Sequence, residues 1–542
     1  MALFGSDWNC RLVREMYHRL AAVAIVAAFF AVTPAQASLL PSPSEFITPS
    51  EQSLFGDAVR AQMAGKEGDK TASLAILDSV LAREVEPTKF RGFVQMLRSD
   101  LLLDAERSEE AIAAADEAVR LLPGYSGPLL LAMHAYAYSS RAGEGADYLI
   151  RASEIDPEIV RTLLDDYEVF SLLHRLDAAN DERRLGSVSD RLLVIGWRGH
   201  KLDSRSKLAS DAIPRRLRNG DMAGAHSLIP ELLVPADTYG MLASNRYRAL
   251  WPDLEKWAGP KLERQWQLYL TEARSRWNAS HDTESADAYL SALLSAGRYQ
   301  DVVTDILPIF NGDLDKVRDY DLIYRVSGVA SALGALGRWD DVRKLYATAE
   351  RTWPLGSDVN ALNLTGNEAK YALAMGEPQR ALGLLDRTIA EAERHRDGIN
   401  ADAFVQMHLY RTCALHALGR DSEAAGSLAL AATTTTVENS VQLRLCIGDD
   451  AGAREAMLRA LADDSKRDDA IAVLQKPGTP PLKSAYDEQM EKRWNALRTD
   501  PRILAELAKY GRLLPFTLNE AAQFAPEPKV PESKTSNPGP VT

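Results

Sequence analysis

The sequence predicts an all-α fold, an α-solenoid assembled from antiparallel helix pairs. Its length of 542 residues exceeds what one compact core usually serves, so we expect several domains or an elongated array. Apolar residues make up 46% and charged residues 26% of the chain, as in ordinary folded proteins, and Ala and Leu recur throughout, which favours helices. A short pattern that indicates a turn between two helices also returns six times.

The repeated pattern is a glycine, four mostly polar residues, and then a small residue that opens an apolar helix. The glycine and the small residue of the six copies are Gly220 and Ala225, Gly297 and Val302, Gly337 and Val342, Gly376 and Ala381, Gly419 and Ala424, and Gly448 and Ala453. A glycine in the left-handed conformation ends one helix, and the polar residues cap the next. We expect the small residue where the two helices cross, because a larger side chain would push them apart.

Two proline-terminated segments give the repeat its length. Ala111, Ala118 and Pro123 have the spacing of a tetratricopeptide repeat, and Pro157 follows Pro123 by 34 residues, which is one repeat length. From Gly297 onward the pattern glycines lie 40, 39, 43 and 29 residues apart. The chain therefore resembles the tetratricopeptide repeat family over most of residues 53–465. The resemblance implies a superhelix whose concave inner surface binds a protein or peptide, and it implies binding rather than catalysis.

The N-terminal sequence has the features of a secretory signal peptide. Arg11, Arg14 and Arg19 precede an apolar run over residues 20–32 that is short for a membrane span, and small residues follow it. We expect cleavage after Ala37, with an uncleaved anchor as the alternative, and translation could begin at Met1 or at Met16. The protein is expected to be exported to the periplasm of a Gram-negative bacterium, with secretion or association with the envelope as the alternative, and with no stable membrane span after cleavage.

Composition divides the rest of the chain into further segments. Between residues 160 and 219 the pattern fades into a divergent helical hairpin, and the proline-rich stretch at 478–481 ends the array. The expected order is a signal peptide (1–37), a linker (38–52), N-terminal repeats (53–159), divergent Trp-rich helical repeats (160–285), C-terminal repeats (286–470), capping helices (471–524) and a disordered tail (525–542).

Four tryptophans distinguish the stretch from residue 247 to residue 280. They are Trp251, Trp257, Trp266 and Trp277, and the last two share a helical face with Leu270 and Ala273. One interpretation is an aromatic binding surface that includes Trp251 and Trp257. The other is the core of a non-standard helix pair, because amphipathic spacing usually means core.

The candidate partner-binding residues come from the family resemblance. Positions of the first helix in each pair that face inward in the family correspond here to His134, Lys370, Gln406 and His416. We expect the partner to be a protein or peptide. The formal charge of −13 disfavours nucleic acid as the main partner. The sequence leaves the identity of the partner and the oligomeric state open.

Nothing in the sequence indicates a cofactor, a metal site or a catalytic centre. Nucleophile elbows, Walker loops and dinucleotide fingerprints are absent from a strand-to-helix context. His200 has no partner that a motif identifies, and on a helix Cys413 projects away from His408. Cys413 and Cys446 are the cysteines left after signal cleavage, and an exported compartment permits a disulfide without requiring one.

The leading functional hypothesis is therefore a non-enzymatic periplasmic scaffold or adaptor that serves an envelope, secretion or polysaccharide assembly. One alternative is an enzyme with an unrecognised site in residues 160–280. The other alternative is a carbohydrate-binding module, which would require exposed tryptophans.

Overall fold

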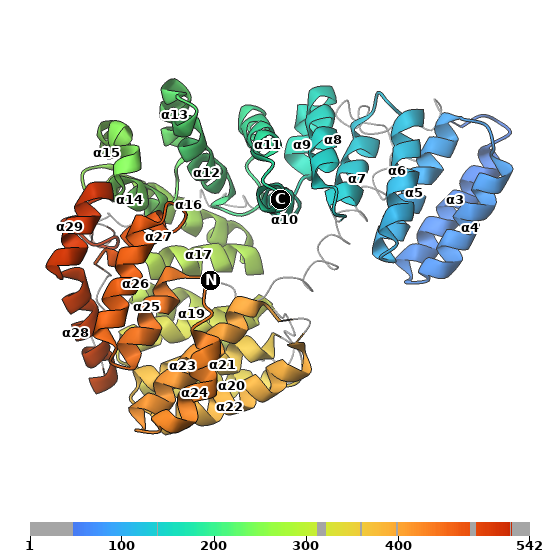
Figure 1. Ribbon diagram of the computed structural model, residues 1–542. Helices are drawn as coiled ribbons and strands as arrows, with labels where there is room; N and C mark the ends of the chain where they lie inside the picture. The colour runs from blue at the N-terminus through green and yellow to red at the C-terminus, as the bar shows by residue number, and fades with distance from the viewer. Residues whose placement is uncertain are drawn as a thin grey trace, which may run out of the picture. The chain divides into compact units, whose positions relative to one another are not determined.

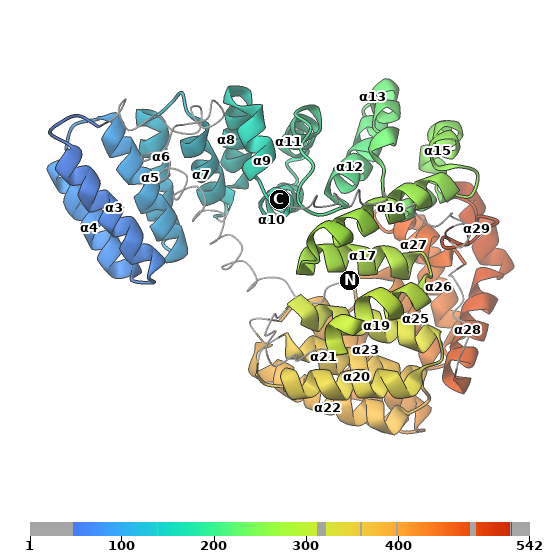
Figure 2. The same cartoon turned by 180° about the vertical axis from the view of Figure 1, so that it is seen from behind.

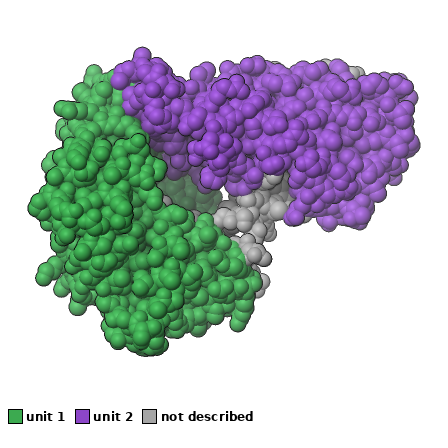
Figure 3. Space-filling model, viewed as in Figure 1, with its two compact units in different colours: residues 1–5, 226–542 green, residues 6–225 purple. Residues whose placement is uncertain are grey.

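The computed structural model describes residues 47–137, 139–311, 321–357, 360–396, 399–476, 484–520 and 522. These residues are helical and contain no strand, with one isolated bridge between Ser244 and Gly511. The prediction of an all-α fold is therefore confirmed. The expected signal peptide and disordered tail lie outside the described residues. The chain divides into an N-terminal unit that ends at Ala225 and a C-terminal unit that starts at His226, as coloured in Figure 3.

The N-terminal unit consists of helices that pack mainly as consecutive pairs, α3 with α4, α5 with α6, and α7 with α8 (Figure 1). Its helices are α3 (Gln52–Lys66), α4 (Lys70–Arg83), α5 (Lys89–Asp104), α6 (Ser108–Leu121), α7 (Ser126–Ala137), α8 (Ala142–Ile155), α9 (Pro157–Leu163), α10 (Asp166–Ala178), α11 (Glu182–Val194), α12 (Ser204–Arg218) and α13 (Met222–Ser227), which runs into the next unit. The divergent segment 160–219 is helical, as expected, and its fully buried Trp197 donates a hydrogen bond to Leu164 O at 3.0 Å.

The C-terminal unit opens with short and irregular helices and continues with regular pairs. Its helices are η2 (Ile229–Glu231), α14 (Pro235–Ala243), η3 (Asn245–Leu250), α15 (Trp251–Ala258), α16 (Glu263–Ser280), α17 (Thr283–Ser295), α18 (Tyr299–Asp301), η4 (Val302–Ile306), η5 (Leu307–Asn311), α19 (Asp321–Ala335), α20 (Trp339–Thr352), α21 (Ala361–Ala374), α22 (Pro378–Arg394), α23 (Ala401–Ala417), α24 (Asp421–Ala431), α25 (Val437–Cys446), α26 (Asp450–Ala462), α27 (Arg467–Leu474), α28 (Ala485–Arg498) and α29 (Pro501–Tyr510).

The turn pattern of the sequence has the expected geometry at all six places. Its six glycines have φ between 68° and 78°, in the left-handed region that ends a helix. The six small residues that follow are all buried, at 4% exposure or less. The pattern does not cover the earlier hairpins of the N-terminal unit, and in α5–α6 and α10–α11 the left-handed position is held by Glu106 (φ 60°) and Asn180 (φ 55°) in place of glycine.

Ala381 offers a direct test of the crossing-point interpretation. It is fully buried in α22, so Ala381→Leu must force the helix pair α21–α22 apart, and we expect a loss of about 1–3 kcal/mol in the free energy of unfolding. Ala390→Leu lies on the exposed side of the same helix and is the matched control, with an expected change within about 0.5 kcal/mol. Urea unfolding measures both. Equal effects of the two substitutions would contradict the close crossing.

The second helix of one pair is broken into short pieces. Where the pattern at Gly297 predicts one continuous helix, residues 299–311 form a single α-helical turn, a π-helical segment over Val302–Ile306 and a 3₁₀ segment over Leu307–Asn311. Val302 and Ile306 remain fully buried, so the irregular stretch keeps its packing while the backbone hydrogen bonds change register.

The end of the C-terminal unit returns to its beginning. α27 packs against α14, and α29 packs against α26 and η3, so late helices lie beside early ones in both Figures 1 and 2. After α29 an extended stretch, residues 511–518, continues across α14 and α16; we call it the closure segment. Arg512 N donates to Ala243 O at 2.8 Å, and a Cβ at Gly511 would lie 2.5 Å from the same oxygen, so only glycine fits there.

Tertiary contacts hold the closure segment along its length. Tyr239 Oη donates to Phe516 O at 2.9 Å, and Trp266 Nε1 donates to Leu518 O at 2.8 Å. Leu514 N donates to Gln475 Oε1 at 3.0 Å. The sequence predicts capping helices here, and α28 does pack on α25 and α26. The closure segment is a second element that covers the array, since it contacts residues from the beginning and from the end of the unit.

Candidate functional site

A lysine and three tyrosines from three different helices interact electrostatically in the C-terminal unit, Lys370 with Tyr371 and Tyr410, and Tyr486 with Tyr410. Lys370 and Tyr371 lie on α21, Tyr410 lies on α23, and Tyr486 lies on α28; we call them the lysine–tyrosine cluster. Lys370 is exposed, and the three tyrosines are half-buried. α21 and α23 are the first helices of consecutive pairs, and α28 packs against α21. The cluster therefore combines residues from two repeats with one residue from the segment that follows the array.

Neighbouring groups and burial raise the pKa values of Lys370, Tyr371 and Tyr486. The pKa of Lys370 is raised above its usual value, chiefly because the phenol of Tyr410 lies beside it, with contributions from Tyr371 and Glu438. Burial raises the pKa of Tyr371, and burial likewise raises the pKa of Tyr486. At neutral pH the cluster thus presents one ammonium group beside the protonated phenols of Tyr371 and Tyr486. Such groups donate hydrogen bonds to carbonyl or carboxylate oxygens and offer aromatic faces.

The ring of Tyr371 is anchored rather than free to turn. Its hydroxyl donates to Ser327 O of α19 at 2.9 Å, and its ring centroid lies 5.8 Å from that of the fully buried Tyr346. The backbone that carries the neighbouring Lys370 is therefore held in place. Tyrosine held in this way contributes contact area to an interface at little cost in side-chain entropy.

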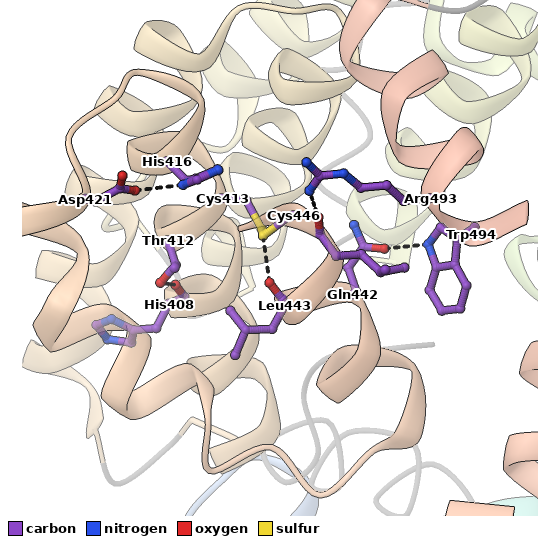
Figure 4. The surroundings of a disulfide bond; sticks show 11 residues. His408, Thr412, Cys413, His416, Asp421, Gln442, Leu443, Cys446, Arg493 and Trp494 are labelled. Atoms are coloured by element: carbon purple, nitrogen blue, oxygen red, sulfur yellow. Dashed lines mark hydrogen bonds and ion pairs between the residues drawn. A yellow bond between two sulfur atoms is a disulfide. The ribbon is translucent and has the colours of Figure 1, made fainter. Parts of the chain in front are cut away.

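A disulfide and two side chains of α28 connect α23, α25 and α28 (Figure 4). Cys413 of α23 and Cys446 of α25 form a disulfide with their Cα atoms 5.4 Å apart. The sequence left this pairing open. Arg493 donates to Leu445 O, and Trp494 Nε1 donates to Gln442 Oε1 at 2.9 Å. These contacts tie α28 to the end of α25.

The four residues taken from the family positions have different surroundings. Gln406 is half-buried on α23, four residues before Tyr410, and so lies on the same face of that helix as the cluster. His416 lies at the end of α23, where its Nδ1 is 2.7 Å from Asp421 Oδ1, and so belongs to the turn before α24 (Figure 4). Of the four predicted residues, the cluster therefore contains Lys370 and is flanked by Gln406.

His134 requires a correction, because it does not lie on an accessible surface. It is 4% exposed on α7, and its Nδ1 lies 3.2 Å from Oε1 of the equally buried Glu168 of α10. The α7 sequence is apolar on every side, so the helical offset that suggested an inward-facing histidine could not distinguish core from groove. His134 joins two helices inside the N-terminal unit.

Trp251 and Trp257 are likewise engaged within the fold. Both are half-buried, and their indole N–H groups donate to Met241 O at 3.0 Å and to Leu232 O at 3.2 Å. The guanidinium of Arg512, in the closure segment, covers the Trp251 ring at 3.7 Å from its centroid. The core interpretation of the Trp-rich stretch fits these residues better than an open aromatic surface. Trp277 is also half-buried but differs from them, because it lines a hollow.

The divergent region places its polar groups in structural roles. Asp166 is buried and accepts hydrogen bonds from His200 N at 2.7 Å and Lys201 N at 3.1 Å, which fixes the loop before α12. Asp165 and Glu168 form a capping box on α10. Within the described ranges, no group of three or more His, Cys, Asp or Glu side chains is arranged to hold a metal ion. In the same residues no helix combines the length and apolarity needed to cross a membrane.

The hairpin turns, the buried crossing residues and the consecutive helix pairs define an all-α protein built from repeated antiparallel helix pairs. No family model matches the sequence, and no curated protein matches it.

The chain is similar to several solved structures at low identity and low TM-score. The P58(IPK) TPR domain is 13% identical, with 76% of this chain and 100% of that chain covered and a TM-score of 0.20. Yeast Tom70 is 13% identical, with 85% and 100% covered and a TM-score of 0.27. The APC/C hetero-tetramer Cut9–Hcn1 is 11% identical, with 89% and 96% covered and a TM-score of 0.27. These likenesses concern the fold alone and place no ligand on this chain.

Proposed function

We propose that this protein is a non-enzymatic scaffold or adaptor that binds a protein or peptide at the lysine–tyrosine cluster. The observation that carries the proposal is the exposed Lys370 set among half-buried tyrosines from three helices. Tyrosine is typical of the centre of protein interfaces, and an ammonium group beside it donates charge-assisted hydrogen bonds. A partner with acidic or backbone carbonyl oxygens at its contact surface would complement these donors.

The proposed location is the periplasm or another compartment of the bacterial envelope. Two features support it. The N-terminal sequence has the basic region, apolar run and small residues of a secretory signal. The disulfide between Cys413 and Cys446 is of a kind that persists in oxidising compartments and is rare in the cytosol.

Site-specific photo-crosslinking in cells tests the binding surface. A benzophenone amino acid placed at Gln406, beside the cluster, is expected to yield a discrete adduct with one partner, which mass spectrometry identifies. The same probe at Lys344 is the control, because Lys344 is 78% exposed on α20, the second helix of its pair. Adding Lys370→Glu to the Gln406 probe is expected to reduce the adduct about tenfold, since a charge-assisted hydrogen bond contributes roughly 1.5–3 kcal/mol.

Two outcomes of this experiment would contradict the proposal. Identical adducts from the Gln406 and Lys344 probes, or an adduct at Gln406 that Lys370→Glu leaves unchanged, would place the interface elsewhere.

A further inference from the structure

A hollow of about 470 Å³ lies in the C-terminal unit, between the end of α16 and the irregular stretch 302–311. Its volume falls within the range of about 300–1,000 Å³ that small-ligand pockets occupy. α16 contributes Arg274, Trp277 and Asn278, which lie on adjacent positions of its last two turns, and His281 follows directly after that helix. None of these residues belongs to the lysine–tyrosine cluster.

The aromatic wall of the hollow is a half-buried indole fixed by a histidine. The ring centroids of Trp277 and His281 are 4.5 Å apart, with 50° between the ring planes. His281 has φ of 52°, a left-handed conformation that ends α16 and turns its ring back against Trp277. Three of the four tryptophans of this stretch donate their N–H groups to backbone carbonyls, whereas Trp277 instead lines the hollow.

The opposite wall comes from the irregular stretch. Asp305 lies in the π-helical segment, and Pro308 and Ile309 lie in the 3₁₀ segment that follows. Tyr289 Oη donates to Asp305 Oδ2 at 2.8 Å, which fixes the carboxylate at the wall. A π-helical segment inside a helix is rare and occurs frequently at functional sites. Asp305, Pro308 and Ile309 lie three and four positions apart, and all three line the same hollow.

Arg274 supplies a cation to the lining of the hollow. It acts electrostatically on Tyr289, yet among the described residues it forms neither a hydrogen bond nor an ion pair. Asn278 and His281 next to it are exposed. The hollow thus presents a planar aromatic face, a small apolar edge and a rim of donors and acceptors that includes one charge of each sign.

We infer that this hollow binds a sugar ring that carries a carboxylate, a unit of an acidic oligosaccharide. The negative face of an indole attracts the C–H groups on the flat side of a sugar ring. The hydroxyl groups at the ring edge both donate and accept, and they match Asn278 and Asp305. The guanidinium of Arg274 pairs with the sugar carboxylate in a charge-assisted hydrogen bond. An apolar peptide side chain would leave these polar rim groups unpaired, which is costly.

Isothermal titration of the full chain with a trimer of galacturonic acid tests the inference, with the neutral trimer of galactose as the matched ligand. We expect binding of the acidic trimer, accompanied by a change in tryptophan fluorescence. Trp277→Ala is expected to weaken it about tenfold through lost stacking. Arg274→Gln is expected to weaken the acidic trimer about tenfold while changing the neutral one less than about twofold. Arg274 is a surface side chain, so this second variant keeps the test valid if Trp277→Ala fails to fold.

Trp339→Phe, in α20, is the control for a half-buried tryptophan outside the hollow, and it should leave the affinity unchanged. Absence of binding by both trimers at about 10 mM, where even a millimolar Kd is measurable, would overturn the inference. So would binding of a short Asp/Glu peptide that depends on Arg274 but not on Trp277, because that result would assign the hollow to an acidic peptide. Neither outcome bears on the Gln406 crosslink.

Discussion

Trp266→Ala is expected to reduce the free energy of unfolding of the C-terminal unit by about 3–5 kcal/mol, the range for removal of a fully buried aromatic side chain. Trp266 is 0% exposed, packs against Tyr269 and donates its indole N–H to Leu518 O of the closure segment at 2.8 Å. The substitution leaves a cavity beside α16, and the Leu518 carbonyl loses its hydrogen-bond donor. The loss should appear as a lower urea midpoint of the full chain.

Two further substitutions separate the contributions to this effect. Trp266→Phe keeps an aromatic ring but loses the donor to Leu518 O, so we expect about 1–3 kcal/mol from the unsatisfied carbonyl together with the smaller ring. Trp257→Phe removes a comparable N–H bond, to Leu232 O, from a half-buried ring and should cost less than Trp266→Ala. If Trp266→Ala changed the stability by less than about 1 kcal/mol, Trp266 would not be a core residue that joins the two ends of the unit.

Removal of the disulfide is expected to cost about 2–4 kcal/mol, the typical contribution of a bond that closes a loop of this size. Cys413 and Cys446 are 33 residues apart in sequence and join α23 to α25, so the bond restricts the unfolded chain across one whole repeat. The double variant Cys413→Ser/Cys446→Ser and the reduced natural protein should show the same lowered urea midpoint. A reducing agent should have no further effect on the double variant.

The state of the two thiols provides the check on this prediction. In protein isolated under non-reducing conditions, neither cysteine should react with an alkylating reagent after unfolding. Quantitative alkylation of both would show that the pair is reduced in the cell, and it would remove one of the two supports for an exported location.

The repeat itself could be predicted from the sequence because its turns depend on local chemistry. A glycine in the left-handed region and a small residue five positions later are visible in any window, and all six copies have the expected glycine conformation and the buried small residue. Where Glu106 and Asn180 replace the glycine, the same geometry has no sequence signal. Local patterns thus identify most turns and miss those formed by residues that adopt this conformation less readily.

The candidate site could be predicted only in part, because its members meet through tertiary packing. Lys370 and Gln406 follow from repeat offsets, but Tyr486 lies on a helix outside the array and its place beside Tyr410 depends on how α28 returns. His134 was assigned to the surface although its helix is apolar on every side. The closure segment is held mainly by bonds to backbone carbonyls and by residues more than 200 positions away, which no short pattern encodes.

Hydrogen exchange of the intact chain tests most directly whether the C-terminal unit closes on itself. The amide of Arg512, which donates to Ala243 O, and the amide of Leu514, which donates to Gln475 Oε1, should exchange as slowly as those of the early helix α14. Trp266→Ala should accelerate exchange in both stretches together. Exchange of residues 511–518 at the rate of an unstructured chain, with α14 still protected, would contradict the closed unit.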